Sequence, residues 1–114
     1  MELKDRIEAF VKHADEVTSE YWKRQGFTFS GPPTHRADYL SAKWCRILTV
    51  ENGVGRSVYA FVCLQDGFTK ALGTLKAGDI HKAATFKAPA KHARGSVFQE
   101  GFNNCATPHG IVYL

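Results

Sequence analysis

The sequence lacks paired cysteines and long apolar runs. Only three of its 114 residues are cysteines, and it contains no C-x-x-C or H-x-x-H pairing. A disulfide framework and a zinc site are therefore not expected, and we expect no metal and no other cofactor. No apolar run approaches the roughly 20 residues that a membrane-spanning helix needs, and the first residues are amphipathic and acidic, unlike a signal peptide. These absences predict a cytoplasmic protein that does not enter a membrane.

The familiar arrangements of catalytic residues are also missing. Cys105 and His109 form the one close cysteine–histidine pair in the sequence, in a region that supplies no orienting acid. No two histidines have a spacing that places them on one face of one element, as an acid–base pair would require. The H-x-T/S repeat of paired phosphoesterases is absent. We therefore expect a protein that is not an enzyme. His13 and His35 are expected to be surface residues.

Length and composition indicate a single domain over residues 1–114. The hydrophobic fraction of 44% and the charged fraction of 23% are ordinary for a folded globular protein. A chain of this length supports one hydrophobic core, but it is small enough that partner surfaces often supplement the core. The composition therefore fits a monomer or a homodimer.

Positive charge is concentrated in one part of the chain. The segment from residue 70 to residue 94 has a net charge of +5, whereas the whole chain has +4. The single acid of this segment is Asp79, and its cationic residues are Lys70, Lys76, Lys82, Lys87, Lys91 and Arg94. Such a concentration is typical of a surface that meets an anionic partner. A solvated lysine-rich face is the alternative that charge alone leaves open.

Apolar residues recur every three or four positions between residues 2 and 25, which predicts one long amphipathic helix. The stripe consists of Leu3, Ile7, Phe10, Val11, Ala14, Val17, Tyr21 and Trp22. Gly26 follows the stripe directly and is suited to end the helix. The spacing also admits a coiled-coil dimer, but the mixture of alanine and aromatic residues favours packing on a sheet.

Two alternating segments, residues 39–51 and 56–64, predict the central strands of a sheet, joined by a hairpin turn. Shorter extended segments are predicted at 80–87, 96–98 and 111–114. Residues 27–38 are expected to form a connection that is not helical at its centre, and residues 68–75 an irregular or short helical connection. The pattern predicts an α+β fold, in which the N-terminal amphipathic helix packs on a four- or five-stranded, mostly antiparallel sheet. The predicted helix-to-sheet core consists of Ile7, Phe10, Val17, Trp44, Ile47, Val58 and Phe61.

The basic segment has a local pattern of its own, KAGDIHKAATFKAPAKHARGSVF at residues 76–98. Gly78 is expected to supply the positive φ of a turn before the strand at 80–87. Pro89 suits the first position of a helix, where its missing N–H costs nothing. One to two helical turns are therefore expected over residues 90–94.

The start of this expected helix is a candidate phosphate site. Free N–H groups at a helix start favour an anion, and Lys87, Lys91 and Arg94 would surround it. The predicted ligand-binding residues are Lys82, Lys87, Lys91, His92 and Arg94. For a nucleic acid, exposed aromatic residues such as Phe86 or Tyr59 would stack on bases.

Several motifs of the chain resemble a recurrent, uncharacterised family of small bacteriophage proteins. They are RSVYAF at residues 56–61 and the segment GDI-x-KAA-x-x-KAPAKHARG at residues 78–95. The resemblance covers residues 44–98; in those proteins position 86 is more often Trp, and the segment 65–75 is shorter than here. It implies a phage or prophage origin and an accessory role, and it supplies no catalytic residue.

Two non-enzymatic functions follow from these observations. In the first, the basic segment binds a phosphate-bearing ligand, a nucleic acid or a nucleotide, without reading its sequence. In the second, the chain is a phage-encoded inhibitor of a host protein, for defence evasion or host takeover, and docks on an acidic surface. A second basic element and an RNP-like aromatic strand are absent, which disfavours sequence-specific recognition of a nucleic acid.

The cysteine pattern predicts three free thiols. Cys45 and Cys63 lie in apolar strand patterns, where buried thiols are expected. The sequence offers no disulfide pairing and no sign of secretion into an oxidising compartment, so all three cysteines are expected to be reduced. Titration of the denatured protein with a thiol reagent should therefore detect three groups. A titration that finds one reactive group would show that two of the cysteines are paired.

Overall fold

The N-terminal apolar stripe forms one long helix, α1 (Leu3–Gln25), as the sequence predicts. In the computed structural model, which describes residues 2–26, 32–51, 53–108 and 110–111, Ile7, Phe10 and Ala14 have no exposed surface. Gly26 ends the helix in the left-handed conformation, with φ of 71°, and its N–H donates to the Lys23 carbonyl. The periodicity of the sequence therefore determines both the buried face of the helix and its end.

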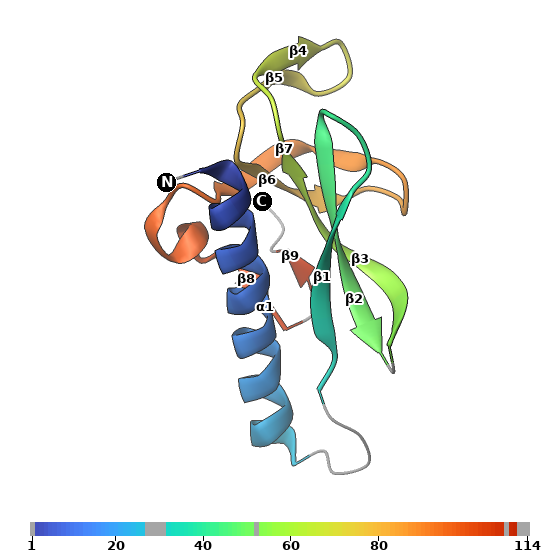
Figure 1. Cartoon of the computed structure of the whole chain (residues 1–114), viewed down its shortest axis with the longest axis vertical. Coiled ribbons are helices and arrows are strands. Elements are labelled where there is room, and N and C mark those ends of the chain that lie inside the picture. Colours follow the sequence, from blue (N-terminus) through green and yellow to red (C-terminus); the bar gives the residue numbers. More distant parts are fainter. Residues whose placement is uncertain (1, 27–31, 52, 109, 112–114) are drawn as a thin grey trace.

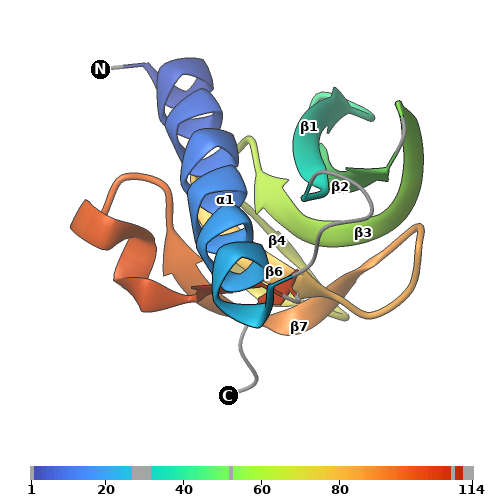
Figure 2. The same ribbon diagram turned by 90° about the horizontal axis from the view of Figure 1, so that it is seen from below.

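The helix packs on an antiparallel sheet of five strands, which confirms the predicted α+β class (Figure 1). The sheet order is β1 (Thr34–Tyr39), β2 (Trp44–Glu51), β3 (Val54–Cys63), β6 (Asp79–Ala83) and β7 (Pro89–Ser96). Two small hairpins and a short 3-10 helix complete the fold: β4 (Gly67–Thr69) with β5 (Gly73–Leu75), η1 (Glu100–Asn104), and β8 (Ala106–Thr107) with β9 (Gly110–Ile111). The sheet is strongly curved, and α1 lies alongside it (Figure 2).

Several predicted boundaries of these elements are wrong. Of the long strand expected over residues 39–51, only Trp44–Glu51 forms one strand, β2; Tyr39 ends β1, and in the turn between them the Ser41 hydroxyl accepts the N–H groups of Lys43 and Trp44. The strand expected over residues 80–87 ends at Ala83, and the extended segment expected at 96–98 stops at Ser96, where β7 ends. The connection expected over residues 27–38 contains most of β1. The segment 68–75 forms the β4–β5 hairpin instead of a helical excursion. Residues 27–31, Asn52 and the end of the predicted last strand, 112–114, lie outside the described residues.

The two faces of the central strands have different partners. Cys45 pairs with Val62 and Ile47 with Ala60, and all four side chains are buried against α1. Trp44, Arg46, Phe61 and His81 alternate with these residues and lie on the opposite side, which we call the outer face. Trp44 and Phe61 were expected in the helix-to-sheet core, and this expectation is wrong. They pack on each other on the outer face, with ring centroids 6.2 Å apart. Val17 and Val58, also expected in that core, are half-buried and do not belong to the buried cluster.

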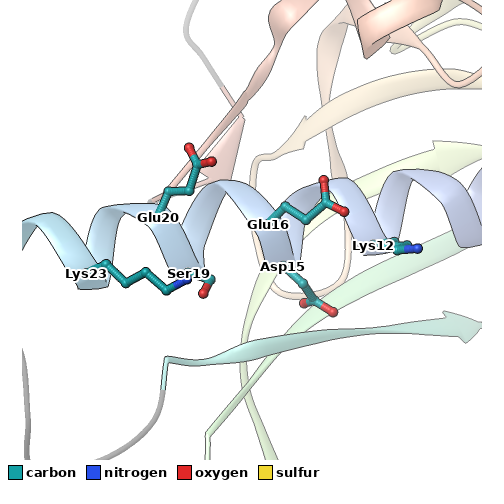
Figure 3. Close-up of a pocket in the computed structure, with 6 residues that line it drawn as sticks. All are labelled: Lys12, Asp15, Glu16, Ser19, Glu20 and Lys23. Carbon is teal, nitrogen blue, oxygen red and sulfur yellow. The ribbon is translucent and has the colours of Figure 1, made fainter.

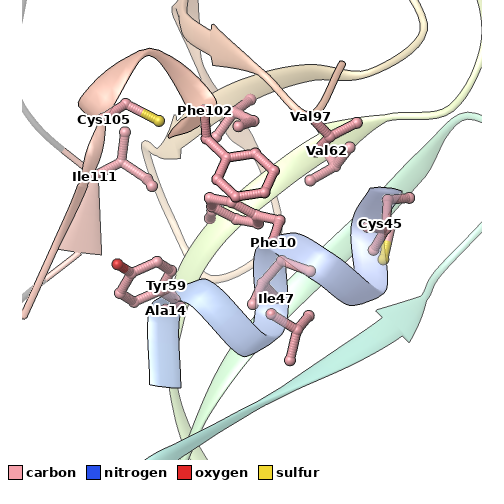
Figure 4. Packing of buried hydrophobic residues seen from close by; sticks show 14 residues of the cluster. Phe10, Ala14, Cys45, Ile47, Tyr59, Val62, Val97, Phe102, Cys105 and Ile111 are labelled. Atoms are coloured by element: carbon pink, nitrogen blue, oxygen red, sulfur yellow. The ribbon is translucent and has the colours of Figure 1, made fainter. Parts of the chain in front are cut away.

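The core between α1 and the sheet is centred on Phe10 (Figure 4). Its ring lies 5.3 Å from that of Phe102 and 6.3 Å from that of Tyr59. The C-terminal segment also supplies Val97, Cys105 and Ile111 to this cluster, although the sequence analysis assigned none of them to the core. The helix is therefore held between the sheet and the C-terminal segment.

Phe102 reaches the core through an unusual backbone conformation. Its φ is 53°, in the left-handed region that is costly for a residue with a large side chain. The Phe102 ring contacts Phe10 and His13, and the Arg6 guanidinium lies 5.4 Å from its centroid. These contacts offset the cost of the backbone conformation.

No helix among the described residues is long and apolar enough to span a membrane.

Substitution of Phe10 tests the packing of α1 on the sheet. Since the Phe10 side chain is completely buried, Phe10→Ala should lower the free energy of unfolding by about 3–5 kcal/mol. Chemical denaturation measures this change. Phe68→Ala is the matched control, because Phe68 is 73% exposed and its loss should change stability by less than about 0.5 kcal/mol. Equal stability of the two variants would contradict the packing described above.

Candidate functional site

The basic segment forms a hairpin of two strands, β6 and β7, at the edge of the sheet. His81 pairs with Ala93 and Ile80 with Gly95, so residues 90–94 are extended and the predicted helix at Pro89 is wrong. Pro89 is tolerated because it is the first residue of an edge strand, where no neighbour needs its N–H. A helix of one to two turns is too short to be stable by itself, whereas pairing with β6 supplies tertiary contacts. No helix start is therefore available to hold a phosphate here.

The tip of the hairpin, residues 84–88, is a compact turn. The N–H groups of Ala84 and Thr85 donate to the Ala88 carbonyl at 3.0 and 3.1 Å. The Thr85 hydroxyl oxygen accepts the N–H groups of Lys87 and Ala88 at 3.2 and 3.1 Å. Gly78, before β6, has the expected positive φ, 93°. The hydrogen bonds of the turn leave the Lys87 side chain exposed at the tip of the hairpin.

The five predicted site residues all lie on the β6–β7 hairpin, but they differ in exposure. Lys87, Lys91 and His92 are exposed on the hairpin. Lys82 is half-buried, and its ammonium donates to the Ile111 carbonyl at 3.1 Å. Arg94 is also half-buried, and its guanidinium donates to the His92 carbonyl. Lys82 and Arg94 therefore belong partly to the framework of the hairpin.

Arg46 of β2, which is not among the predicted site residues, connects the hairpin tip to the outer face. Its guanidinium lies 4.4 Å from the centroid of the Phe86 ring and donates to the Phe86 carbonyl at 3.0 Å. It also donates to the Asp38 carboxylate at 2.9 Å. Phe86 nevertheless remains 51% exposed, whereas Tyr59, the other aromatic expected to stack on bases, is buried and donates its hydroxyl to the Thr107 carbonyl. Phe86 is the exposed member of that pair.

His81 is buried and hydrogen-bonds to β7 next to the exposed Lys91. Its side chain is 2% exposed, and Nδ1 lies 2.8 Å from the Ala90 carbonyl. With the proton assigned to Nδ1, Nε2 is an acceptor, and it is buried without a hydrogen-bond partner among the described residues. The ring meets Trp44 edge-on at 5.3 Å. Burial lowers the pKa of His81, although the hydrogen bond to Ala90 and the charge of Asp79 oppose this shift.

A second polar cluster joins α1 to β1. The Asp15 carboxylate lies 2.8 Å from His35 Nδ1, and the His35 ring packs edge-on against Tyr59 at 4.4 Å. The prediction that His35 lies at the surface is wrong, because β1 places it beneath the helix, where it is 7% exposed. Burial lowers the pKa of His35 although the hydrogen bond to Asp15 opposes the shift. The cluster is a structural tie between helix and sheet.

A hollow that is open to solvent lies beside this tie. Its volume is about 380 Å³, and it is lined by side chains of α1 alone: Lys12, Asp15, Glu16, Ser19, Glu20 and Lys23 (Figure 3). Acids outnumber lysines there, so the hollow does not attract a phosphate. Within the described ranges, no group of three His, Cys, Asp or Glu side chains is arranged to hold a metal ion.

The three cysteines are buried and free. Burial raises the pKa of the Cys45 thiol to about 12 and that of the Cys105 thiol to about 11. Burial also raises the pKa of Cys63, whose thiol donates to the Gln65 carbonyl. Since the thiolate is the nucleophilic form, these groups are unreactive at neutral pH. His109, the histidine nearest to Cys105 in the sequence, lies outside the described residues.

Comparison with known proteins identifies one family. The model of a family described as a family of unknown function (DUF7717) matches residues 38–107, which is more than half of the chain. The match begins near the end of β1 and includes the whole β6–β7 hairpin, together with Arg46. No curated protein and no solved structure matches the chain significantly.

The buried histidines should make the protein less stable in acid. Because His81 has a lowered pKa in the folded state, the unfolded chain binds its proton first as the pH falls below the ordinary value of 6.5. The free energy of unfolding should therefore be highest above pH 6.5 and should fall until the pH reaches the folded pKa. Urea denaturation at several pH values between neutral and pH ~5 measures the slope.

His81→Gln should reduce this slope, since Gln can still donate to the Ala90 carbonyl but does not titrate. His92→Gln is the matched control at an exposed position of the same hairpin. An identical slope in wild type and His81→Gln would show that His81 does not contribute to acid sensitivity.

Proposed function

The chain belongs to the family of unknown function DUF7717, and from the geometry of the segment that matches this family we propose that it binds a phosphate-bearing ligand through the β6–β7 hairpin. The ligand class is a nucleic acid or a nucleotide, and the chain is not an enzyme. In this proposal it is a phage-encoded accessory protein that acts in the cytoplasm of the host cell. The phage origin rests on the motifs at residues 56–61 and 78–95.

One observation carries the proposal: the hairpin exposes Lys87, Lys91 and His92 in a segment without acids. No Asp or Glu occurs between Asp79 and Glu100. The positive potential of the two lysines is therefore not cancelled by neighbours along the chain. Exposed, uncompensated lysines of this kind attract a phosphate backbone irrespective of its sequence.

The hairpin is also held in one position, which lowers the entropic cost of binding. Arg46 fixes its tip through the Phe86 carbonyl, and His81 hydrogen-bonds to Ala90 in the middle of β7. Arg94 and Lys82 add charge to the same region; Lys82 holds the hairpin to β9 through the Ile111 carbonyl, and Arg94 donates to the His92 carbonyl within β7. We therefore assign direct contact with phosphate to Lys87, Lys91 and His92.

The inhibitor function is the second candidate, and the position of β7 favours it. An edge strand presents unpaired backbone groups on which an extended segment of another protein can pair. In that case the basic side chains would steer an acidic host protein towards the edge. Both candidates predict binding that weakens with salt, so the identity of the partner has to be tested directly.

Removal of the two exposed lysines tests the proposal. Lys87→Ala/Lys91→Ala should abolish most binding of a labelled random-sequence oligonucleotide, measured by fluorescence anisotropy, because two phosphate contacts are lost. It should also flatten the plot of log K against log salt by roughly 1 to 2 units, since each contact contributes about 0.7 to 0.9. The melting temperature should stay nearly unchanged, because both side chains are exposed.

Lys12→Ala/Lys23→Ala is the matched control. It removes the same charge from exposed positions on α1, where acids are interspersed, and should leave affinity and salt slope close to wild type. If both double variants weaken binding equally, the effect comes from net charge and not from the hairpin. A wild-type protein without affinity for DNA, RNA or nucleotides would overturn the proposal in favour of the host-protein inhibitor.

A further inference from the structure

We infer that the ligand of the hairpin is single-stranded nucleic acid, whose unpaired bases stack on aromatic side chains of the outer face. The inference rests on the proposed function and adds the class of ligand. Single-stranded nucleic acid is bound by a combination of backbone-tracking cations and aromatic platforms. The outer face supplies both, in a continuous series from Phe86 through Trp44 to Phe68.

Phe86 is the first platform. Arg46 covers one side of its ring, with the guanidinium 4.4 Å from the centroid, yet half of the Phe86 side chain is exposed. Its exposed area therefore lies away from Arg46, where a base can stack. Arg46 donates a hydrogen bond to Asp38, so the guanidinium that contacts the Phe86 ring is already positioned in the protein without a ligand. Little side-chain entropy remains to be lost when a base stacks on it.

Trp44 continues the series along the same strand. It precedes Arg46 by two positions in β2, so the two side chains are neighbours on one face of the sheet. Its ring is fixed edge-on by Phe61 and His81, at 6.2 and 5.3 Å between centroids. Trp44 remains half-buried instead of fully buried.

The β4–β5 hairpin completes the surface. Phe68 is 73% exposed, and it lines a small pocket of about 40 Å³ together with Trp44 and Lys43. A pocket of this size is too small for a free ligand of drug size, but it can admit an edge of a base that lies against Trp44. Lys43 is exposed beside it, as Lys87 is exposed beside Phe86. Each end of the aromatic series therefore has a cation for a phosphate.

The aromatic series distinguishes single strands from duplexes. In a duplex the bases already stack on each other, so they are unavailable to Phe86 and Phe68. The described part of the chain also has no basic helix for a major groove, because the exposed side of α1 carries both signs of charge. Duplex DNA would therefore contact only the lysines, through its phosphates, and not the aromatic side chains.

Substitution of Phe86 tests this inference. Phe86→Ala should weaken binding of a labelled single-stranded oligonucleotide by roughly 5- to 100-fold, whereas binding of a duplex of the same sequence should change little. The salt slope for the single strand should stay as in wild type, since no phosphate contact is lost. Phe86→Leu keeps the apolar volume of the tip without an aromatic face and should show the same selective loss.

Tyr39→Ala is the matched control. Tyr39 is an exposed aromatic, 44% accessible, but it pairs with Cys45 and therefore lies on the face of the sheet towards α1. This variant should bind single strands like wild type. DNA and RNA single strands, tested in parallel, identify which of the two sources of unpaired bases is bound more tightly.

The outcomes separate the two proposals. Preference for single strands that disappears in Phe86→Ala and Phe86→Leu but not in Tyr39→Ala supports the inference. If single strands and duplexes bind equally, lose affinity in Lys87→Ala/Lys91→Ala and ignore Phe86, the inference is overturned while the proposed function stands. If no oligonucleotide binds to wild type, both fail, and a host protein becomes the partner to be sought.

Discussion

The structure depends on one constraint: each strand of the sheet has two faces, and a single helix covers only one of them. Cys45, Ile47 and Val62 point towards α1 and are buried in one cluster with Phe10. The alternating residues of the same strands are also large, and other side chains have to shield them from water. They obtain this cover from one another and from the tip of the β6–β7 hairpin, which Arg46 holds against the sheet.

This second cover explains why Phe86, at the tip of the hairpin, lies at the outer face. A partly buried guanidinium is costly unless its donors are paired. Arg46 pairs Nη2 with Asp38 and Nη1 with the Phe86 carbonyl, whereas its Nε is buried without a hydrogen-bond partner among the described residues. Its contact with the Phe86 ring contributes about 0.5–1 kcal/mol more at a partly exposed site. The contacts of Arg46 thus also hold an exposed aromatic ring next to Lys87. Packing and the proposed binding surface share the same residues.

The polar groups beneath the hairpin have a parallel role. His81 is buried next to Trp44, yet it hydrogen-bonds to Ala90 and so shapes the part of β7 from which Lys91 and His92 project. Its buried position makes the neutral form the stable one. On the other side of the sheet, the Asp15–His35 pair ties α1 to β1 in a similar way. Each face therefore contains one buried histidine that links two elements.

Much of the fold was predictable because its signals are local. The apolar repeat of α1, the glycine that ends it and the alternation in β2 and β3 each follow from the geometry of a single element. The cationic residues of the candidate site were also visible as a charge imbalance along the chain. Pro89 misled the prediction, because the same fixed φ suits a helix start and an edge strand, and only pairing with β6 decides between them.

The sequence by itself determined the α+β class, the buried stripe of α1 and the location of the basic segment, since periodicity and charge are properties of neighbouring residues. The tertiary structure decided which face of the sheet α1 covers, that Phe102 and the C-terminal segment enter the core, and that His35 is buried. It also decided that Arg46 lies under Phe86, forty positions away in the chain. Contacts between distant residues depend on the curvature and register of the sheet, and no local pattern encodes them.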